Sequence, residues 1–268
     1  MPTQSLVPDY VATAQKVRRT ILEMIYKTRS PHIGSSFSIV EILVALYFKV
    51  LNISDDADRD RFILSKGHAC PALYATLYEK NFLTRGDIEG FAVDHGILEQ
   101  HPKSDLKKKI EVSTGSLGHG LSIGAGMSLA AKVARKPFRV FVLLSDGELN
   151  EGSVWEAVLF AGHHALNNLT ALVDFNKMQA LGFTRNILNL EPLGEKWRSF
   201  GWHPQEVDGH DFGQIFRAVH NLSSDRPNVI ILHTTKGQGV SFRENNLLWH
   251  YRAPDDHEFL LAKTELSK

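Results

Sequence analysis

Apolar residues recur along the first part of the chain with the spacing of helices. Residues 10–28 carry apolar side chains every three or four positions and predict an amphipathic helix: Ala14, Val17, Ile21, Leu22 and Ile25. Residues 42–46 are apolar on nearly every side, which predicts a helix buried in the core. Ser38 followed by Glu41 has the spacing of a capping box and predicts the start of that buried helix.

Four later segments are apolar without alternation, and they predict buried strands. They cover residues 61–64, 139–144, 169–175 and 228–234. Continuous apolar strands that alternate with helices are typical of a parallel sheet covered by helices on both faces. A capping box of Ser153 and Glu156 predicts a helix reaching about residue 168, and Asp211 with Gln214 predicts another helix start.

These elements predict a three-layer α/β/α fold with a mainly parallel sheet. The composition shows no break that would mark a linker, so residues 1–268 are predicted to form a single domain. A chain of this length with 43% apolar residues can bury a substantial core without disulfides or structural metals.

Charge and cysteine content narrow the classes of function. The 30 basic and 30 acidic residues balance, which removes the general electrostatic case for a nucleic-acid or membrane-surface partner. The single cysteine, Cys70, fits a reducing cytosol. The first twenty residues lack a signal-peptide core, and the strongly apolar stretch at 42–48 is shorter than a membrane helix. We therefore expect a cytoplasmic protein without a nucleic-acid or membrane partner.

Two oxygen-bearing side chains are predicted to follow neighbouring strands. Asp146 comes after the strand at 139–144, and Asn176 comes after the strand at 169–175. Since parallel strands end at a common edge, where α/β folds bind ligands, the two side chains can meet on one ion. Hard oxygen ligands suit Mg²⁺ or Ca²⁺, and Mg²⁺ prefers sites completed by phosphate and water. Gly147 lets the backbone approach a phosphate closely. The simpler alternative is that Asp146-Gly147 is only a turn.

The chain has 13 histidines, and four of them lie in loops beside glycine or proline: His32, His68, His101 and His250. Functional side chains concentrate in such loops. The other histidines are expected to be ordinary surface or core residues. Neither a Cys/His zinc spacing nor an HExxH motif occurs, so transition-metal chemistry is not expected.

Glycines at 118, 120 and 124 have a spacing that imitates a dinucleotide-binding fingerprint. The order is GxGxxxG, however, and no convincing strand precedes it. A small-residue helix packed closely on its neighbours is the preferred interpretation of this segment.

Residues 145–157 (SDGELNEGSVWEA) and 168–182 (NLTALVDFNKMQALG) together resemble the thiamine diphosphate signature of transketolases, which usually begins Gly-Asp-Gly. The resemblance extends over nearly the whole chain, because further segments follow in family order: 30–43 (SPHIGSSFSIVEIL), 59–69 (RDRFILSKGHA), 101–130 and 234–254. It implies a thiamine diphosphate-binding fold and transfer of a two-carbon ketol unit from a ketose to an aldose.

The resemblance implies a metal site and a diphosphate site. Asp146, Asn176 and the backbone carbonyl of Met178 would hold a Mg²⁺ ion, with Ca²⁺ or Mn²⁺ as substitutes, that bridges to the cofactor diphosphate. Gly147 would place its amide near the diphosphate. Ser145 stands where the motif has glycine, and its hydroxyl is expected to help bind a phosphate oxygen.

The rest of the cofactor would be held by loop residues. Gly115 and Leu117 would contact the aminopyrimidine, while His68 and His250 would bind the diphosphate.

The resemblance also implies catalytic residues. His32, His101 and His250 would line the channel to the reactive carbon and contact sugar hydroxyls. Ketol transfer moves protons on and off oxygens, for which imidazole is suited near neutral pH. Glu151 would belong to a buried network linking the two active sites of a dimer; a plain acidic residue at a helix start is the alternative.

In transketolases, a second domain supplies the glutamate that activates the cofactor, and this chain ends at Lys268 before such a domain. The resemblance therefore implies a split enzyme in which a separate C-terminal subunit completes the site, with two copies of each chain and sugar phosphates or related sugars as substrates. Two alternatives stay open. One is another thiamine enzyme subunit, of the 2-oxo acid dehydrogenase or deoxyxylulose phosphate synthase type; the other is a non-catalytic regulatory subunit.

Overall fold

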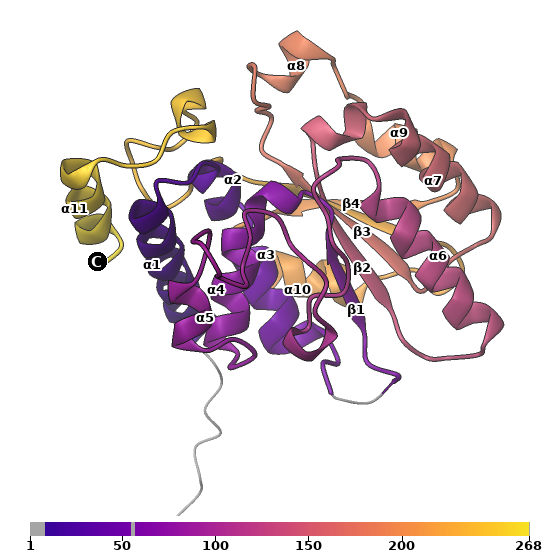
Figure 1. Cartoon of the computed structure of the whole chain (residues 1–268). Helices are drawn as coiled ribbons and strands as arrows, with labels where there is room; N and C mark the ends of the chain where they lie inside the picture. The colour runs from indigo at the N-terminus through magenta and orange to yellow at the C-terminus, as the bar shows by residue number, and fades with distance from the viewer. Residues whose placement is uncertain (1–8, 55–56, 268) are drawn as a thin grey trace, which may run out of the picture.

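A five-stranded parallel sheet forms the centre of the molecule (Figure 1). The computed structural model describes residues 9–54 and 57–267. The strands are β1 (Arg61–Leu64), β2 (Val140–Ser145), β3 (Leu169–Phe175), β4 (His203–Asp208) and β5 (Asn228–His233), in the order β1-β2-β3-β5-β4. Four of them confirm the predicted strands to within a residue at either end.

Helices cover both faces of the sheet, which confirms the three-layer α/β/α prediction (Figure 1). One face carries α1 (Tyr10–Thr28), α2 (Ile33–Phe37), α3 (Val40–Ala45), α4 (Cys70–Glu79) and α10 (Phe212–His220). The other carries α6 (Gly120–Val133), α7 (Gly152–His163) and α9 (Leu193–Ser199). Three further α-helices in the described residues are short or peripheral: α5 (Arg85–Glu89), α8 (Thr184–Ile187) and α11 (Asp256–Glu265).

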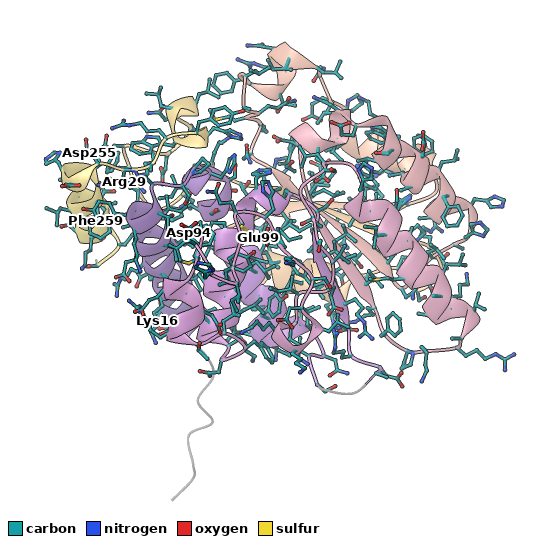
Figure 2. The ribbon with its side chains drawn as sticks, viewed as in Figure 1. Lys16, Arg29, Asp94, Glu99, Asp255 and Phe259 are labelled. Atoms are coloured by element: carbon teal, nitrogen blue, oxygen red, sulfur yellow. The ribbon has the colours of Figure 1, made fainter. Side chains whose placement is uncertain are left out.

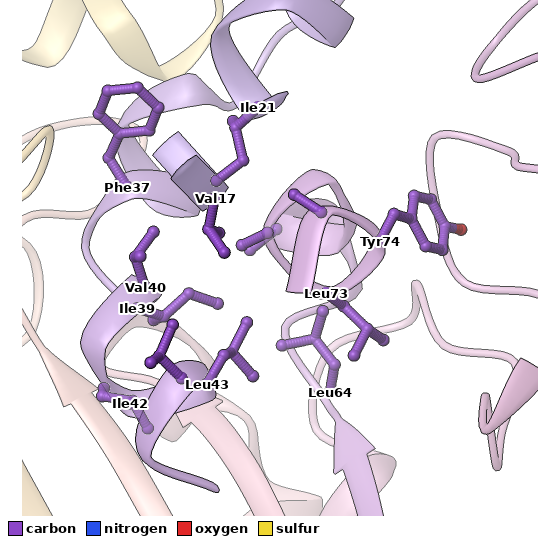
Figure 3. Close-up of a cluster of buried hydrophobic side chains, with 14 of the residues drawn as sticks. Val17, Ile21, Phe37, Ile39, Val40, Ile42, Leu43, Leu64, Leu73 and Tyr74 are labelled. Atoms are coloured by element: carbon purple, nitrogen blue, oxygen red, sulfur yellow. The ribbon is translucent and has the colours of Figure 1, made fainter. Parts of the chain in front are cut away.

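Alternate residues of each central strand enter two separate cores. Phe141 and Leu143 of β2 join the core beneath α1, α3 and α4, whereas Val140 and Val142 join the core beneath α6 and α7. Figure 3 shows part of the first core, in which Val17 and Ile21 of α1, Leu43 of α3 and Leu73 of α4 belong to one cluster of buried side chains. Since both strand faces are buried, the strand sequences are apolar without alternation.

The helical stretch Ile33–Val50 has the length and hydropathy of a membrane span, but 83% of it is buried inside the protein. Its apolar character is that of a core segment, in agreement with the buried helix predicted there.

α11 packs across the end of α1. Tyr26 stacks on Phe259 with ring centroids 4.0 Å apart, and Arg29 pairs with Asp256 at 2.9 Å. Figure 2 shows Arg29 close to Asp255 and Phe259 at this contact. The last helix therefore covers the first, which brings the segment preceding α11 towards the start of α2.

Both predicted capping boxes are wrong, whereas the helix start at Asp211 is confirmed. The Ser38 hydroxyl donates to Asp174 on β3 at 2.8 Å, and α3 begins two residues later without a side-chain cap. The Ser153 hydroxyl donates to the carbonyl of Gly118 at 2.9 Å, and α7 ends at His163. Asp211 accepts a hydrogen bond from the amide of Gln214 at 3.0 Å. The two serine hydroxyls therefore bind residues that are distant in the sequence instead of the amides at a helix start.

Strand β4 was not predicted. It lies at the sheet edge, pairs only with β5, and its residues His203–Asp208 are mostly half-exposed or exposed. Pro204 is tolerated there because an edge strand has one unpaired side. A polar segment containing proline gives no strand signal in the sequence.

Glu41 belongs to a buried hydrogen-bond network instead of a capping box at the start of α3. Its carboxylate pairs with the Arg18 guanidinium through bonds of 2.6 and 2.7 Å and with His210 Nδ1 at 2.9 Å. Nε2 of His210 accepts from the backbone amide of Thr235 at 2.8 Å. This hydrogen-bond network thus connects α1 and α3 to the segment that carries Lys236.

We predict that Glu41 makes the fold acid-sensitive. Burial alone would raise the pKa of Glu41, but the Arg18 charge and the hydrogen bonds from His210 and Arg18 outweigh it and lower the pKa to about 2. A lowered carboxyl pKa contributes stability above the unfolded value near 4.5 that is lost as pH falls towards 2. The difference is worth about 3 kcal/mol. Urea unfolding of the native chain and of Glu41→Gln at several pH values should show this loss only in the native chain.

The control is Glu195→Gln, since Glu195 makes only an exposed pair with Arg198 on α9. An equal loss of unfolding free energy in native and Glu41→Gln proteins between pH 4.5 and 2 would contradict the prediction.

Candidate active site

A cavity of about 290 Å³ opens at the carboxyl edge of the sheet, beside the ends of β2 and β3. With one exception, the residues predicted to act in catalysis, cofactor binding and metal binding all line it: His32, His68, His101, Gly115, Leu117, Ser145, Asp146, Gly147, Asn176, Met178 and His250. They come from segments that are more than two hundred residues apart in the sequence, from His32 to His250. The parallel register, with Ser145 opposite Asp174, brings Asp146 and Asn176 to adjacent strand exits.

The exception is Glu151. Its side chain is exposed at the residue preceding α7 and does not line the cavity. The structure therefore does not bring Glu151 together with the other predicted residues within one chain, and its role in a subunit network stays a prediction.

Asp146 is a buried carboxylate with few contacts that offset the cost of burying its charge. It is 1% exposed and accepts hydrogen bonds from the Gly147 amide at 2.8 Å and the Thr184 hydroxyl at 3.2 Å. Burial, and then the nearby charge of Asp174, raise the pKa of Asp146 to about 7. Within the described residues Asp146 has no ion-pair partner. A bound cation would supply the missing countercharge.

Asn176 and Met178 turn oxygen atoms towards the same region. The Asn176 amide donates to Asp174 at 3.1 Å, while its Oδ1 accepts from the Met178 amide at 3.0 Å. The carbonyl of Met178 accepts from Lys236 Nζ at 3.3 Å. This donor set of carboxylate, amide oxygen and carbonyl is typical of Mg²⁺ or Ca²⁺ ligands.

Two buried lysines in the cavity were not predicted. Lys66 and Lys236 are each 1% exposed and both line the cavity. Lys66 Nζ pairs with the Asp174 carboxylate, and Lys236 Nζ lies 3.0 Å from His250 Nδ1. Burial, followed by the charge of Lys66, lowers the pKa of Lys236 to about 8. Lys66 lies beside the Gly67-His68 pair already singled out, and that neighbour was the available signal.

The loop histidines form a cluster at the cavity mouth. The ring centroid of His32 lies 5.1 Å from that of His68 and 5.2 Å from that of His250. Burial, and then neighbouring positive groups, lower the pKa of His32 to about 4 and that of His250 to about 3, and they lower the pKa of His68 as well. The three imidazoles are therefore neutral at physiological pH in the unliganded protein and can both accept and donate hydrogen bonds.

The cavity walls fit a compact polar ligand. The Nε2 atom of Gln179, which lines the cavity, is buried and has no hydrogen-bond partner among the residues that the structure describes. A Cβ added to Gly147 would lie 3.3 Å from the Gln179 side chain, so glycine keeps this wall open. Gly115 borders the ring of His101 in the same way, at 3.4 Å. An orphaned donor and glycine-lined walls are what a bound diphosphate would use.

Ser145 sits in regular strand geometry at the end of β2. Its hydroxyl accepts from the Glu148 amide at 3.2 Å, and its own amide donates to the Glu148 carboxylate at 3.3 Å. Serine is therefore accommodated without a positive φ at the position where the motif has glycine.

A second cavity, of about 540 Å³, lies alongside the first and shares Asn176 with it. Lys177, Arg185 and His233 line it, but the cavity contains none of the loop histidines predicted to act in catalysis.

The glycines at 118, 120 and 124 belong to a packed helix start, as preferred over a nucleotide site. α6 begins at Gly120, and a Cβ added to Gly124 would lie 2.5 Å from Val142 of the sheet. The close helix-sheet contact explains the small residues.

Comparison with known proteins identifies the class. The sequence model described as the transketolase thiamine diphosphate binding domain matches residues 11–267. The chain therefore belongs to the transketolase family, and it matches the thiamine diphosphate binding domain of that family.

Among relatives, the chain is 38% identical to an apulose-4-phosphate transketolase subunit of Phocaeicola vulgatus, covering 95% of this chain and 92% of that protein. It is 40% identical to a 6-deoxy-6-sulfo-D-fructose transketolase subunit of a Clostridium species, covering 97% of each. The solved transketolase of Leishmania mexicana superposes with a TM-score of 0.91 at 26% identity. That match covers 97% of this chain and 42% of the solved chain, so this chain spans about two fifths of the length of such transketolases.

These matches favour transketolase over the alternatives raised from sequence. The Phocaeicola and Clostridium relatives are named as transketolase subunits rather than as 2-oxo acid dehydrogenase or deoxyxylulose phosphate synthase subunits, and the superposed structure is a transketolase as well.

Proposed function

We propose that this chain is the cofactor-binding subunit of a two-subunit transketolase that transfers a two-carbon ketol unit from a ketose to an aldose. The observation that carries the proposal is the cavity that gathers Asp146, Asn176 and the loop histidines at one sheet edge. Relatives matched over 92% and 97% of their length are named as transketolase subunits, which supports a separate partner chain.

In this proposal the metal is Mg²⁺, held by Asp146, Asn176 and the Met178 carbonyl, with Ca²⁺ and Mn²⁺ as substitutes. The unpaired buried carboxylate and the oxygen donor set support this assignment. Lys66 and Lys236 add positive charge on the wall facing the diphosphate. Gly147 would let the backbone approach the diphosphate closely. The Gln179 amide would donate a hydrogen bond to it, since its Nε2 has no partner among the described residues.

Thiamine diphosphate, when bound, supplies the carbon nucleophile and the electron sink. The chain's own histidines handle protons: His32, His101 and His250 face the cavity as hydrogen-bonding groups towards sugar oxygens. The lowered pKa values of His32 and His250 keep these rings neutral, so each offers one acceptor and one donor nitrogen.

The substrate we propose is a ketose bearing a terminal anionic group. One relative is named for a sugar phosphate and another for a sulfonated sugar. We further propose a cytoplasmic assembly of two cofactor-binding and two C-terminal subunits, in which Glu151 lies at a subunit contact. The exposure of Glu151 in the single chain is compatible with such a contact.

Reconstitution tests the function. We expect the purified chain with thiamine diphosphate and Mg²⁺ to show no ketol transfer, and the mixture with its C-terminal partner subunit to transfer a ketol unit from apulose 4-phosphate, 6-deoxy-6-sulfofructose or fructose 6-phosphate to an aldose. Full activity of the chain alone would refute the split enzyme. Cofactor binding without transfer by the assembled complex on any ketose would favour a regulatory subunit, and pyruvate decarboxylation would favour another thiamine enzyme.

A further inference from the structure

Glu148 is a completely buried carboxylate immediately behind the cavity wall. It lies in the 3₁₀ turn Gly147–Asn150, is 0% exposed, and does not line the cavity itself. Its carboxylate accepts hydrogen bonds from the Ser65 hydroxyl, from the Gly118 amide at 2.9 Å and from the Ser145 amide at 3.3 Å. Within the described part of the chain, Glu148 has no ion-pair partner, so its burial is compensated mainly by these hydrogen bonds, with a smaller contribution from the charge of Lys66.

The three donors belong to three different segments of the cavity wall. Each is the chain neighbour of a residue that lines the cavity: Ser65 precedes Lys66, Gly118 follows Leu117, and Ser145 precedes Asp146. One carboxylate therefore joins the exit of β1, the loop before α6 and the exit of β2.

The Gly118 peptide is held on both sides. Its amide donates to Glu148, and its carbonyl accepts from the Ser153 hydroxyl of α7 at 2.9 Å. Gly118 has φ +87°, and an added Cβ would lie 2.5 Å from Ser153 Oγ and 2.7 Å from Glu151 Cβ. The Glu148 carboxylate thus anchors the peptide that directly follows Gly115 and Leu117, two residues that line the cavity.

Ser145 completes the arrangement from the other direction. Its hydroxyl accepts from the backbone amide of Glu148 at 3.2 Å while its amide donates to the Glu148 carboxylate. A glycine at position 145 could make only the second of these bonds. The serine at position 145 and the glutamate at position 148 therefore act as a reciprocal pair that closes the turn behind Asp146.

We propose that Glu148 is a positioning residue for the cofactor: it holds the 115–117 wall, the exit of β1 and the exit of β2 at the separation that thiamine diphosphate requires. The inference rests on the proposed function, since it assumes that thiamine diphosphate occupies this cavity. It differs from a purely structural role, in which the carboxylate would stabilise the fold without setting affinity for the cofactor.

The variants are Glu148→Gln, which keeps the shape and one acceptor oxygen, and Glu148→Ala, which removes both acceptors. The control is Asp60→Asn. Asp60 is also buried, but it pairs with Arg139 at 2.6 Å. It directly precedes β1 and therefore lies at the amino ends of the strands, whereas the cavity lies at their carboxyl ends. All measurements use the full chain, and they are repeated with its partner subunit.

The dissociation constants of thiamine diphosphate and of inorganic pyrophosphate, each with Mg²⁺, are measured by tryptophan fluorescence, and the melting temperature is measured without ligand. We expect Glu148→Gln to weaken thiamine diphosphate binding roughly tenfold, the effect of one lost hydrogen bond to a charged group, and Glu148→Ala to weaken it further. Pyrophosphate should be affected less, because it makes no contact with the 115–117 wall. Asp60→Asn should lower the melting temperature with unchanged affinity.

A lowered melting temperature in Glu148→Gln with both dissociation constants unchanged within about twofold would overturn the inference and leave the proposed function standing. If the unaltered chain bound thiamine diphosphate neither alone nor with its partner subunit, both the proposed function and this inference would fall. With its partner subunit, Glu148→Gln should recover most of its maximal rate at saturating thiamine diphosphate; a lowered maximal rate with unchanged half-saturation would also overturn the inference.

Discussion

Replacement of Asp146 by asparagine is expected to abolish Mg²⁺-dependent binding of thiamine diphosphate while leaving the unliganded fold at least as stable. The side chain is 1% exposed, and its pKa is raised to about 7 by burial and by the charge of Asp174. At pH 8 the native chain therefore carries a buried negative charge without a cation partner, which is costly. Asparagine keeps the shape and the acceptor for the Gly147 amide but removes that charge.

The binding loss should exceed about 100-fold, because the loss of a side chain that only supports a metal ligand already costs 10–100-fold. The measurement is the melting temperature at pH 8 with and without thiamine diphosphate and Mg²⁺. Asp146→Asn should melt no lower than the native chain without ligand and should gain nothing when ligand is added.

The matched control is Asp208→Asn, because Asp208 ends β4 at the same sheet edge but is exposed and lies outside the cavity. This control should keep the full ligand-dependent shift. If Asp146→Asn retained that shift, Asp146 would not be a metal ligand.

The convergence of the candidate site residues was predictable because it depends on local patterns and one topological rule. Continuous apolar runs predicted β2 and β3, and parallel pairing places their exits side by side. Asp146 and Asn176 follow those strands directly, so their convergence required no knowledge of distant contacts. Three of the histidines could also be predicted from local sequence. His32, His68 and His250 were singled out by their position in loops and by the family resemblance, and the centroids of their rings lie within 6.0 Å of one another.

What could not be predicted depends on contacts between distant segments. Ser38 and Ser153 have the spacing of helix caps, but their hydroxyls bond Asp174 and Gly118 from other parts of the chain. Local sequence specifies the donors and not which acceptor the fold brings closest. The burial of Lys66 and Lys236 could not be predicted for the same reason. A lysine in a glycine-containing loop is normally exposed to solvent, and only contacts with distant segments bury these two.

Lys66→Met is expected to destabilise the protein by about 3–5 kcal/mol, the cost of removing one partner of a buried ion pair. Lys66 and Asp174 are 1% and 0% exposed, and the substitution leaves the Asp174 carboxylate with neutral donors only, such as Ser38 at 2.8 Å and Asn176 at 3.1 Å. The pKa of Asp174 is lowered despite its burial, and the Lys66 charge is the leading cause of the lowering. Urea unfolding at pH 7 measures the loss.

The identical substitution at Lys108 is the control, because Lys108 makes a more accessible pair with Asp87 at 2.9 Å. Lys108→Met should cost less than about 1 kcal/mol. An equal cost at the two positions would contradict the assignment of Lys66 to a buried pair that stabilises the fold.

The double variant Lys66→Met/Asp174→Asn separates the fold from the site. Replacing both charges with neutral groups should recover most of the lost unfolding free energy, since no unpaired charge is left in the interior. Cofactor binding should stay weak in this variant, because Lys66 lines the cavity and its charge would attract a diphosphate bound there in a medium of low dielectric constant. Calorimetric titration with thiamine diphosphate and Mg²⁺ measures that binding. Recovery of stability together with native affinity would show that Lys66 serves the core alone, whereas recovery without affinity would show that the same ammonium group stabilises the fold and binds the cofactor.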